Sequence, residues 1–393
     1  MVRDENRAGE EAGKTSKKGW LAAAAGFVAT LILAIVYLLG SGEATEPAEY
    51  SEAMPVVAER AASGGEEDSI LVFFTDPQYP DNPADHQGGL DETLAADIAR
   101  AQSTMDVAAY DFDLLSVADA LAEAHEYGVL VRLVTDSDNF EELAVQQLKS
   151  AGIEVVEDER EAIMHNKFVV IDETIVWTGS WNLTESGTYR NNNNAVRIVS
   201  DLLAENYTVE FEEMFEGREF GPASPADTPH RQVIVENGDK DDGIRIESYF
   251  APEDQVAEKV LALIEQAEDS IRFMAFSFTD DRLGKAMIDQ DEAGLTVQGV
   301  FEERGADPEY SEFGRMYRTE PRMDVRLDGN TYMMHHKVII VDNETVVLGS
   351  FNFSKSADEM NDENILFIHD KDIASLFRAE FKRIYREASE GRE

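Results

Sequence analysis

One motif, His-x-Lys-x4-Asp followed by Gly-Ser-x-Asn, occurs twice in the chain. The first copy spans residues 165–182 and the second spans residues 335–352, so the offset is 170 residues at each motif position. The repeated positions are His165 and His335, Lys167 and Lys337, Asp172 and Asp342, Ser180 and Ser350, and Asn182 and Asn352. Two copies in register indicate an internal duplication, which restricts the chain to folds built from two homologous halves.

A second constant offset, of 166 residues, extends the duplication towards the N-terminus. It relates Ile98–Phe112 to Ile264–Phe278. We therefore predict an N-terminal half over residues 69–220 and a C-terminal half over residues 243–390. The segment between them, residues 221–242, is rich in proline and acidic residues and is predicted to be a linker.

The sequence pattern of each half predicts the order strand, helix, strand, helix, strand, motif hairpin and helix. The apolar runs Phe168–Ile171 and Val338–Val341 are typical of strands that are buried on both faces. Asp172 and Asp342 begin the turns after these strands. A short additional strand is predicted at Gln232–Val235. The predicted fold class is α/β, with two homologous halves.

The N-terminal region has a different composition. Residues 1–18 form a polar tail that ends in lysines, and residues 19–42 carry no charge. These 24 uncharged residues exceed the roughly 20 that a helix needs to cross a bilayer. Trp20 and Tyr37 lie near the ends of the segment, as interfacial aromatic residues often do. The pattern predicts a single-pass membrane anchor with an inside tail, an acidic tether over residues 43–68 and an extracellular catalytic body. A cleaved signal peptide is the alternative, although its apolar core is usually only about 7–15 residues long.

The chain is strongly acidic. Its 34 Lys and Arg residues face 80 Asp and Glu residues, which gives a net charge of −46. This composition resembles that of proteins from extreme halophiles, whose surface charges are screened because the Debye length falls to about 3 Å at molar salt. On that interpretation the net charge says little about the substrate. The alternative is an acidic protein from an ordinary host. The chain has no cysteine, which excludes disulfides and thiolate metal sites.

The motif residues have a common chemistry. Residues i and i+2 of a strand share one face, so each His-x-Lys places an imidazole and an ammonium side by side. Two such faces together would suit a phosphodiester. Lysines and asparagine amides could hold its oxygens, while one imidazole attacks phosphorus and the other protonates the leaving oxygen. His335 and His336 are adjacent and would point to opposite faces. We therefore predict no metal and no cofactor.

Two His-x-Lys-x4-Asp motifs, each followed by Gly-Ser-x-Asn, resemble those of the phospholipase D superfamily. The resemblance covers everything after the tether. It implies two α/β halves related by a pseudo-twofold axis, with the active site at their interface. It also implies a covalent phosphohistidine, no metal, and catalysis by a monomer. The roles implied are a nucleophile for His165, a general acid and then base for His335, phosphate binding for Lys167, Lys337, Asn182 and Asn352, and support for Asp172, Asp342, Ser180 and Ser350.

The two copies differ at a position that the superfamily often fills with glutamate, in Asn-x-Glu-Asn. The second copy reads Asn361–Asn364 and includes Glu363, whereas the first copy has Asn193 at the equivalent place. A carboxylate stabilises an imidazolium and an amide does not. If Glu363 supports His335 of its own half, His335 is an alternative nucleophile.

The sequence leaves the substrate open. The predicted anchor favours a phospholipase D-type hydrolase that acts on lipid headgroups. The segment Gly349–Asn364 resembles that of small bacterial nucleases of the superfamily, so an endonuclease is the main alternative. A cardiolipin synthase-type transferase fits less well, because those enzymes usually carry two membrane helices. A non-catalytic polyanion binder is the remaining hypothesis.

Overall fold

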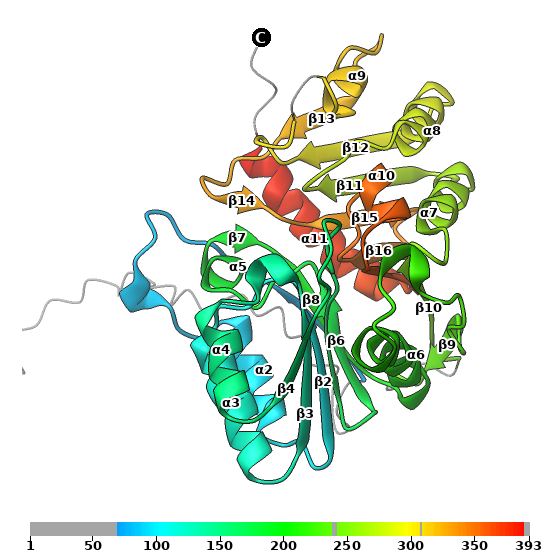
Figure 1. Ribbon diagram of the computed structural model, residues 1–393. Coiled ribbons are helices and arrows are strands. Elements are labelled where there is room, and N and C mark those ends of the chain that lie inside the picture. Colours follow the sequence, from blue (N-terminus) through cyan, green and yellow to red (C-terminus); the bar gives the residue numbers. More distant parts are fainter. Residues whose placement is uncertain (1–68, 238–241, 307–308, 389–393) are drawn as a thin grey trace, which may run out of the picture. The chain divides into compact units, whose positions relative to one another are not determined.

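The computed structural model describes residues 69–237, 242–306 and 309–388 (Figure 1), all within one compact unit, Met54–Glu393. The predicted tail, membrane anchor and tether lie outside the described residues. None of the helices in the described ranges is long and apolar enough to cross a membrane.

The first half is a mixed sheet with helices. Within the described residues it has seven strands in the order β1-β8-β6-β5-β2-β3-β4. The strands are β1 (Ile70–Phe74), β2 (Thr104–Ala109), β3 (Leu130–Thr135), β4 (Glu154–Glu157), β5 (Lys167–Ile171), β6 (Ile175–Gly179) and β8 (Asn194–Val199). The helices are α2 (Leu90–Ile98), α3 (Leu115–Glu126), α4 (Leu143–Ser150), α5 (Glu185–Tyr189) and α6 (Asp201–Glu212).

The second half repeats this arrangement and adds one edge strand. Its described order is β13-β12-β11-β15-β16-β17-β10-β9. The strands are β9 (Gln232–Val235), β10 (Ile244–Ala251), β11 (Ser270–Ala275), β12 (Thr296–Phe301), β13 (Asp324–Leu327), β15 (Lys337–Val341), β16 (Thr345–Gly349) and β17 (Glu363–His369). The helices are α7 (Val256–Glu265), α8 (Asp281–Glu292), α9 (Phe313–Tyr317), α10 (Lys355–Glu359) and α11 (Lys371–Glu387). The α/β class and the strand at Gln232–Val235 are confirmed.

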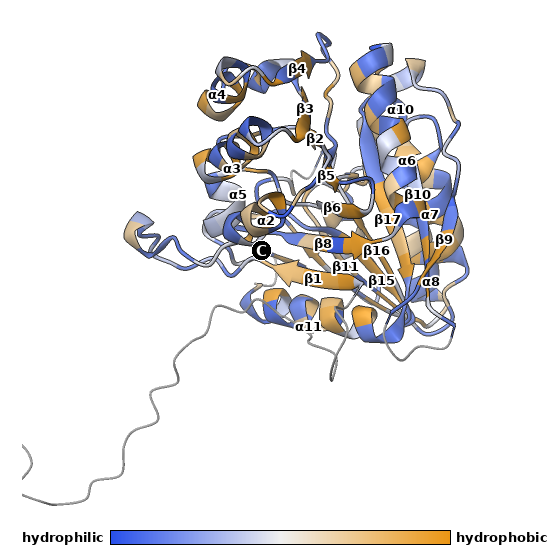
Figure 2. Ribbon diagram, turned by 90° about the horizontal axis from the view of Figure 1, so that it is seen from below, coloured by the Kyte–Doolittle hydropathy of each residue, from blue (hydrophilic) through white to orange (hydrophobic). Residues whose placement is uncertain are grey.

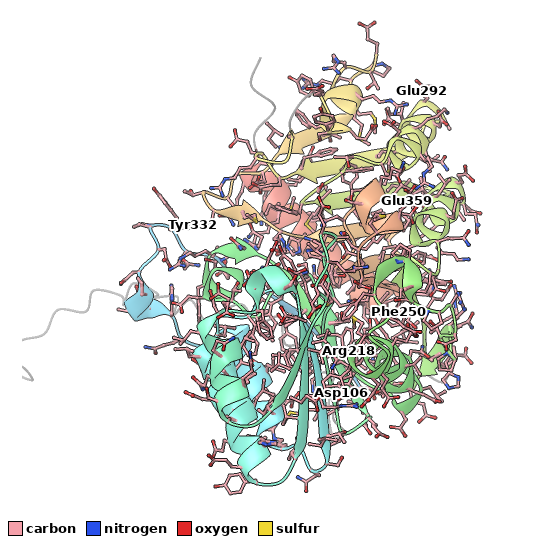
Figure 3. The ribbon with its side chains drawn as sticks, viewed as in Figure 1. Asp106, Arg218, Phe250, Glu292, Tyr332 and Glu359 are labelled. Carbon is pink, nitrogen blue, oxygen red and sulfur yellow. The ribbon has the colours of Figure 1, made fainter. Side chains whose placement is uncertain are left out.

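The two halves share one apolar core. Tyr207 of α6 packs edge-on against Phe250 of β10, with ring centroids 5.2 Å apart. Phe250 is labelled in Figure 3. In the equivalent contact, Phe377 of α11 meets Phe74 of β1 at 5.0 Å. The last helix of each half thus packs on the first strand of the other half. Each buried aromatic ring contributes about 2–3 kcal/mol, so these contacts hold the halves in a fixed orientation. Figure 2 shows the apolar strands beside helices with hydrophilic outer sides.

The motif aspartates stabilise the hairpins and lie away from the histidines. Asp172 and Asp342 adopt left-handed backbone angles, with φ of 53° in both, as hairpin turns with type I′ geometry require. The Asp172 carboxylate accepts the backbone N–H groups of Gln102 and Ser103, which directly precede β2, at 2.8 and 2.7 Å. Asp342 accepts the backbone N–H of Asp269 in the same way, at 2.7 Å. The aspartates therefore tie the β5–β6 and β15–β16 turns to the neighbouring strand.

Candidate active site

The two motifs meet because each half pairs with the other just before its histidine. The short strands β7 (Asn191–Asn192) and β14 (Met333–Met334) run in parallel. A bridge between Met164 and Asp362 is the equivalent pairing. As a result, His335 donates its backbone N–H to Asn192 and His165 donates its own to Asp362, both at 2.9 Å. The catalytic strand of each half thus begins against the Asn-rich segment of the other half.

This crossing corrects one sequence-based expectation. Glu363 was expected behind His335 of its own half. In the structure, the Glu363 carboxylate lies 2.7 Å from Nδ1 of His165, in the other half. The reason is the inter-half pairing of Met164 with Asp362, which brings the next residue, Glu363, against the next residue, His165.

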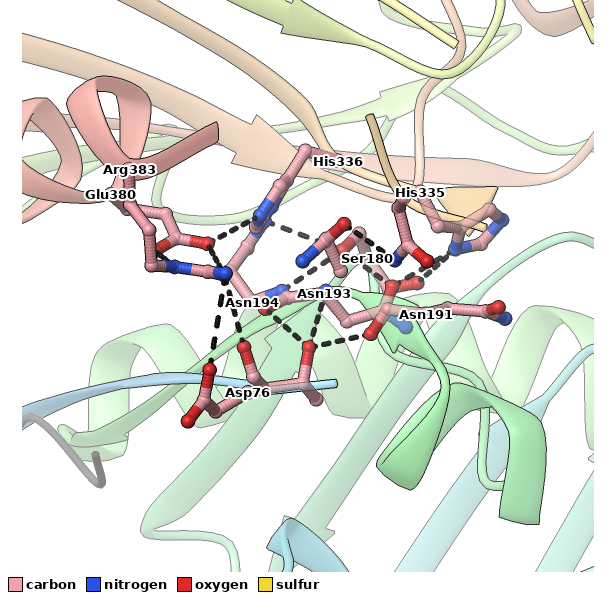
Figure 4. Close-up of polar contacts among 12 residues, drawn as sticks. Asp76, Ser180, Asn191, Asn193, Asn194, His335, His336, Glu380 and Arg383 are labelled. Carbon is pink, nitrogen blue, oxygen red and sulfur yellow. Dashed lines mark hydrogen bonds and ion pairs between the residues drawn. The ribbon is translucent and has the colours of Figure 1, made fainter. Parts of the chain in front are cut away.

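His335 has a neutral partner at the equivalent position. Its Nδ1 lies 2.9 Å from Oδ1 of Asn193 and 3.0 Å from the carbonyl of Ser180 (Figure 4). The Asn193 amide is held in place because its Nδ2 donates to the Gly187 carbonyl and its Oδ1 accepts the Ser180 hydroxyl, both at 2.9 Å. Two acceptors at Nδ1 require a proton on that nitrogen. Nε2 of His335 is therefore the atom that can give or take a proton.

Both motif lysines are buried in the same site. Lys167 donates to the His165 carbonyl at 2.7 Å, and Lys337 donates to the His335 carbonyl at 3.0 Å. Aromatic rings at equivalent positions line the ammonium groups, with Tyr110 beside Lys167 and Phe276 beside Lys337. Burial lowers the pKa of Lys167 to about 7 and lowers that of Lys337 well below its usual value. Both lysines therefore lose positive charge readily in the free site, and a bound anion would favour their protonated forms.

The His165–Glu363 pair holds a proton between two buried groups. Burial raises the pKa of Glu363 to about 8, while burial and the two lysines lower the pKa of His165. His165 is 4% exposed and Glu363 is fully buried. Both shifts favour the uncharged forms of the two groups in the free protein, and the 2.7 Å contact between Nδ1 and Oε2 holds one hydrogen-bonding proton. Because Nδ1 is engaged by Glu363, Nε2 is the nitrogen of His165 that faces a reaction partner when the carboxylate is ionised.

The motif asparagines and serines have separate roles in the geometry. Oδ1 of Asn182 and Oδ1 of Asn352 are buried without a hydrogen-bond partner in the described part of the chain. Each serine hydroxyl accepts a backbone N–H, from Asn194 at 3.1 Å in the case of Ser180 and from Asn364 at 2.9 Å in the case of Ser350. Within the described residues, one buried amide oxygen is thus left unpaired on each side by these two asparagines, whereas the serines connect each hairpin to β8 or β17.

A second set of repeat-related contacts supports the site and was missed in the sequence. Nδ1 of His336 accepts from the Asn194 amide at 2.9 Å, and its Nε2 lies 3.1 Å from Glu380 (Figure 4). In the other half, Asn166 contacts Asn364 at 2.9 Å and Glu210 at 3.0 Å. Residues 166, 194 and 210 are each related to a contact residue of the other half by the 170-residue offset, so the repeat could have predicted these contacts.

One further pair crosses between the halves near the site. Arg160 forms an ion pair with Asp362 at 2.6 Å. At the equivalent positions, the Asn330 amide donates to Oδ1 of Asn192, also at 2.6 Å. Burial raises the pKa of Asp362 to about 7 although Arg160 opposes this shift. The His165 side therefore holds a charged pair where the His335 side holds two amides.

No group of three or more His, Asp or Glu side chains in the described ranges could hold a metal ion.

Comparisons with known proteins agree with the duplicated fold. A family profile described as "Cardiolipin synthase, PLD-like domain" matches residues 94–215 and 260–385. Mitochondrial cardiolipin hydrolase of Xenopus tropicalis is 34% identical over 144 residues, which cover 36% of this chain and 68% of that protein. The phospholipase D family member Nuc of Salmonella typhimurium is 34% identical, with a TM-score of 0.35, over 38% of this chain and 98% of its own. Phosphatidylserine synthase of Haemophilus influenzae shares the fold at 15% identity, with a TM-score of 0.59 over 82% of this chain and 87% of its own.

Proposed function

The chain belongs to the PLD-like domain family, and from that premise we propose that it is a phosphodiesterase that hydrolyses a phospholipid headgroup through a covalent phosphohistidine. The observation that carries the proposal is the different support of two equivalent histidines. His165 has a carboxylate at Nδ1, and His335 has two carbonyl acceptors there. One imidazole is thus suited to carry a positive charge in an intermediate, and the other is suited to exchange a proton.

In the first step, Nε2 of His165 attacks phosphorus and the bond to the leaving oxygen breaks. Nε2 of protonated His335 gives its proton to that oxygen, so no free alkoxide forms. Phosphorylated His165 is an imidazolium, and the Glu363 carboxylate stabilises it through the Nδ1 proton. The bound anion raises the pKa values of His335 and of both lysines, because a negative charge favours their protonated forms.

In the second step, Nε2 of neutral His335 takes a proton from water, and the hydroxide attacks phosphorus. The phosphorus–nitrogen bond breaks and returns His165 to its free form. Lys167 and Lys337, with Asn182 and Asn352, hold the non-bridging oxygens and stabilise their growing charge. The unpaired Asn182 and Asn352 amides support this role, since rotation of either amide about χ2 would present its Nδ2 donor.

A lipid substrate is favoured over a nucleic acid by the charges around the first half of the site. Asp111 lines the same cavity as Lys167 and Asn182. Burial, with the neighbouring charge of Asp113, raises the pKa of Asp111 to about 6, so it is ionised at neutral pH. The equivalent of Asp111 in the second half is Ser277. A carboxylate at this place disfavours a polyanion and suits one phosphodiester with a hydroxylated or cationic leaving group. The name of the cardiolipin hydrolase relative is consistent with this choice.

The test offers phospholipid vesicles and labelled single- and double-stranded DNA to the full-length protein, at high salt and with EDTA. We expect headgroup release that EDTA does not abolish. Cleavage of DNA without headgroup release would select the endonuclease alternative. Loss of turnover with EDTA would contradict the metal-independent mechanism. Transfer of the lipid phosphate to an added alcohol, in preference to water, would select the transferase.

The proposal includes a membrane anchor at residues 19–42, with the tail inside and the catalytic body outside. The absence of cysteine makes a topology test direct, because any introduced thiol is unique. Ser16→Cys should resist an impermeant thiol reagent in intact cells, and Ser51→Cys should react. Labelling at both positions or at neither would contradict this topology. Release of Ser51→Cys protein into the medium would instead indicate a cleaved signal peptide.

A further inference from the structure

Two carboxylates outside the motifs hold the backbone immediately before each histidine. Asp136, which follows β3, accepts the backbone N–H of Met164 at 3.0 Å. Glu302, which follows β12, accepts the backbone N–H of Met334 at 2.7 Å. Both acids are 2% exposed. Asp136 and Glu302 are related by the 166-residue offset of the repeat.

Each of these acids has a second carboxylate beside it. Asp158 accepts the backbone N–H of Ser137, the residue after Asp136, at 2.9 Å. Asp328 likewise accepts the backbone N–H of Glu303, the residue after Glu302, at 2.8 Å. These second acids are both 5% exposed. The same two-carboxylate pattern therefore occurs in both halves, although Asp136 and Glu302 differ in length by one methylene.

The acids also act on the lysines of the site. Glu363 and Asp111 favour the protonated form of Lys167, and the charge of Asp136 adds to their effect. The charge of Lys167 opposes the protonated form of Lys337, Glu363 favours it, and Glu302 adds to the effect of Glu363. Burial raises the pKa of Asp136 to about 6 and that of Glu302 to about 7, with Asp158 and Asp328 adding to the respective shifts. Asp138 also faces Asp136 and adds to its shift. Near neutral pH, Asp136 is largely ionised and Glu302 is close to half ionised.

A purely structural role would account for the backbone contacts alone. Buried carboxylates often accept N–H groups at the ends of strands, and their loss costs stability wherever they lie. That explanation does not predict that the charge of each acid also favours the protonated form of the lysine of the same half. The repetition of both the backbone contact and the lysine interaction separates the two explanations.

We propose that Asp136 and Glu302 are positioning residues of the proposed phosphodiesterase, each fixing the backbone before one catalytic histidine and adding to the negative charge that acts on the lysine of that half. Neither carboxylate reaches the substrate. They act through the Met164–His165 and Met334–His335 peptides and through the electrostatic potential at the lysine ammonium groups. The inference rests on the proposed function for its role in turnover, but its electrostatic part concerns the free protein.

The primary experiment measures lysine titration directly, by NMR of full-length protein labelled with ¹⁵N-lysine, with signals assigned from Lys167→Arg and Lys337→Arg. In Asp136→Asn we expect the pKa of Lys167 to fall by about one unit, which reduces the protonated fraction up to about tenfold. Glu302→Gln should lower the pKa of Lys337. Asp106→Asn is the matched control, because Asp106 is a 3% exposed carboxylate of the same half that pairs with Arg132 instead.

The charge-retaining changes Asp136→Glu and Glu302→Asp keep the experiment decisive if the neutral variants fold poorly. They should leave the lysine pKa values near those of the natural protein. Unchanged lysine titration in Asp136→Asn and Glu302→Gln would overturn the inference, as would an equal shift in Asp106→Asn. If only Asp136→Glu and Glu302→Asp can be purified, the inference fails when either variant changes the pKa of the lysine in its half by about one unit.

Turnover provides a second reading. The alkaline limb of the kcat/KM profile should move to lower pH in Asp136→Asn and Glu302→Gln, because a lysine that loses its counter-charge deprotonates earlier. Asp106→Asn should leave that limb in place. If the natural protein hydrolyses no phosphodiester, the proposed function fails, while the NMR titration still decides whether the acids set the charge of the lysines.

Discussion

The His165 and His335 sides of the site have the same backbone geometry and different charges. Each histidine donates its backbone N–H across the interface at 2.9 Å, and each lysine contacts the carbonyl of its own histidine. The partners at Nδ1 differ, since Glu363 supports His165 and Asn193 supports His335. The duplication thus fixed the positions of the groups, and later substitutions gave the two sides different proton chemistry.

The comparison also gives a physical reason why only one of the two histidines has a carboxylate partner. A buried carboxylate costs several kcal/mol unless positive charge lies close to it. Glu363 has Lys167 and Lys337 nearby, and both lower its pKa against the effect of burial. A second carboxylate at position 193 would have to share these lysines. It would also hold the proton of His335 more tightly, which would weaken His335 as an acid.

The largest difference between the sides should come from removing either imidazole. We expect His165→Ala and His335→Ala each to lower kcat by about 10⁴-fold, because each removes a reacting group. The two variants should differ in whether they form the covalent phosphohistidine. After mixing with ³²P-labelled substrate and quenching with alkali, His335→Ala should retain label and His165→Ala should not. Label only on His165→Ala would mean that His335 is the nucleophile and His165 the general acid. Full activity in both variants would show that the active site lies elsewhere.

Glu363→Gln should lower kcat by about 10²–10³-fold, because an amide cannot stabilise the imidazolium that forms on His165. The matched change on the other side is Asn193→Ala, which removes the amide partner of His335 but leaves the Ser180 carbonyl in place. That change should cost about tenfold or less. Steady-state rates for the two variants test this order. A larger loss from Asn193→Ala would make the His335 side the more sensitive one.

The sequence predicted the composition of the site but not this pairing. Equal offsets were sufficient to identify both histidines, both lysines and the two α/β halves. The i and i+2 spacing on a strand then predicted that each histidine and its lysine share one face. They could not show which half supplies the partner of each histidine. That pairing depends on the bridge between Met164 and Asp362, a contact between distant segments that leaves no local pattern. Asp136 and Glu302 were missed although they obey an offset, because each is a single acid in an acidic chain.

The Arg160–Asp362 pair should contribute more to stability than its neutral counterpart. The Asp362 side chain is 1% exposed, so Arg160→Met leaves a buried carboxylate without its partner and should cost about 3 kcal/mol in the free energy of unfolding. The equivalent change, Asn330→Leu, removes the contact with Asn192 together with the hydrogen bonds to Arg190, Tyr332 and Met333, but leaves no unpaired charge, and should cost about 2 kcal/mol. Urea unfolding of both variants measures the difference. Equal losses would mean that charge adds nothing at this crossing.

The two lysines should make anion binding dependent on pH. Because Lys167 has a pKa of about 7 in the free site and an anion favours its charged form, binding should take up protons above pH 7. The affinity for sulfate, which does not titrate in this range, should fall about tenfold per pH unit for each proton taken up. Calorimetry in buffers of different ionisation enthalpy measures that uptake. Lys167→Arg should reduce it by one proton, and affinity that is independent of pH would contradict the lysine pKa values.

The smallest expected effect lies at the helices that cover the two sides. In α11, Glu380 is paired with Arg383 at 2.6 Å. The residue equivalent to Arg383 in the first half is Glu213, which directly follows α6 and lies three residues after Glu210. Burial, a hydrogen bond to Asp227 and nearby acids raise the pKa of Glu213 to about 9. The folded protein therefore binds more protons here than the unfolded chain does, so stability decreases as pH rises from about 5 to 9.

Glu213→Arg should reproduce the ion pair of the second half and remove this loss. We expect Tm to rise by about 2–4 °C at pH 8 and by less at pH 5, where Glu213 is protonated in the natural protein. The reverse exchange, Arg383→Glu, should lower Tm most at high pH, because it transfers the acidic pair to α11. Differential scanning calorimetry of both variants at the two pH values checks this. If the shifts do not depend on pH, the difference between the helices arises from packing and not from charge.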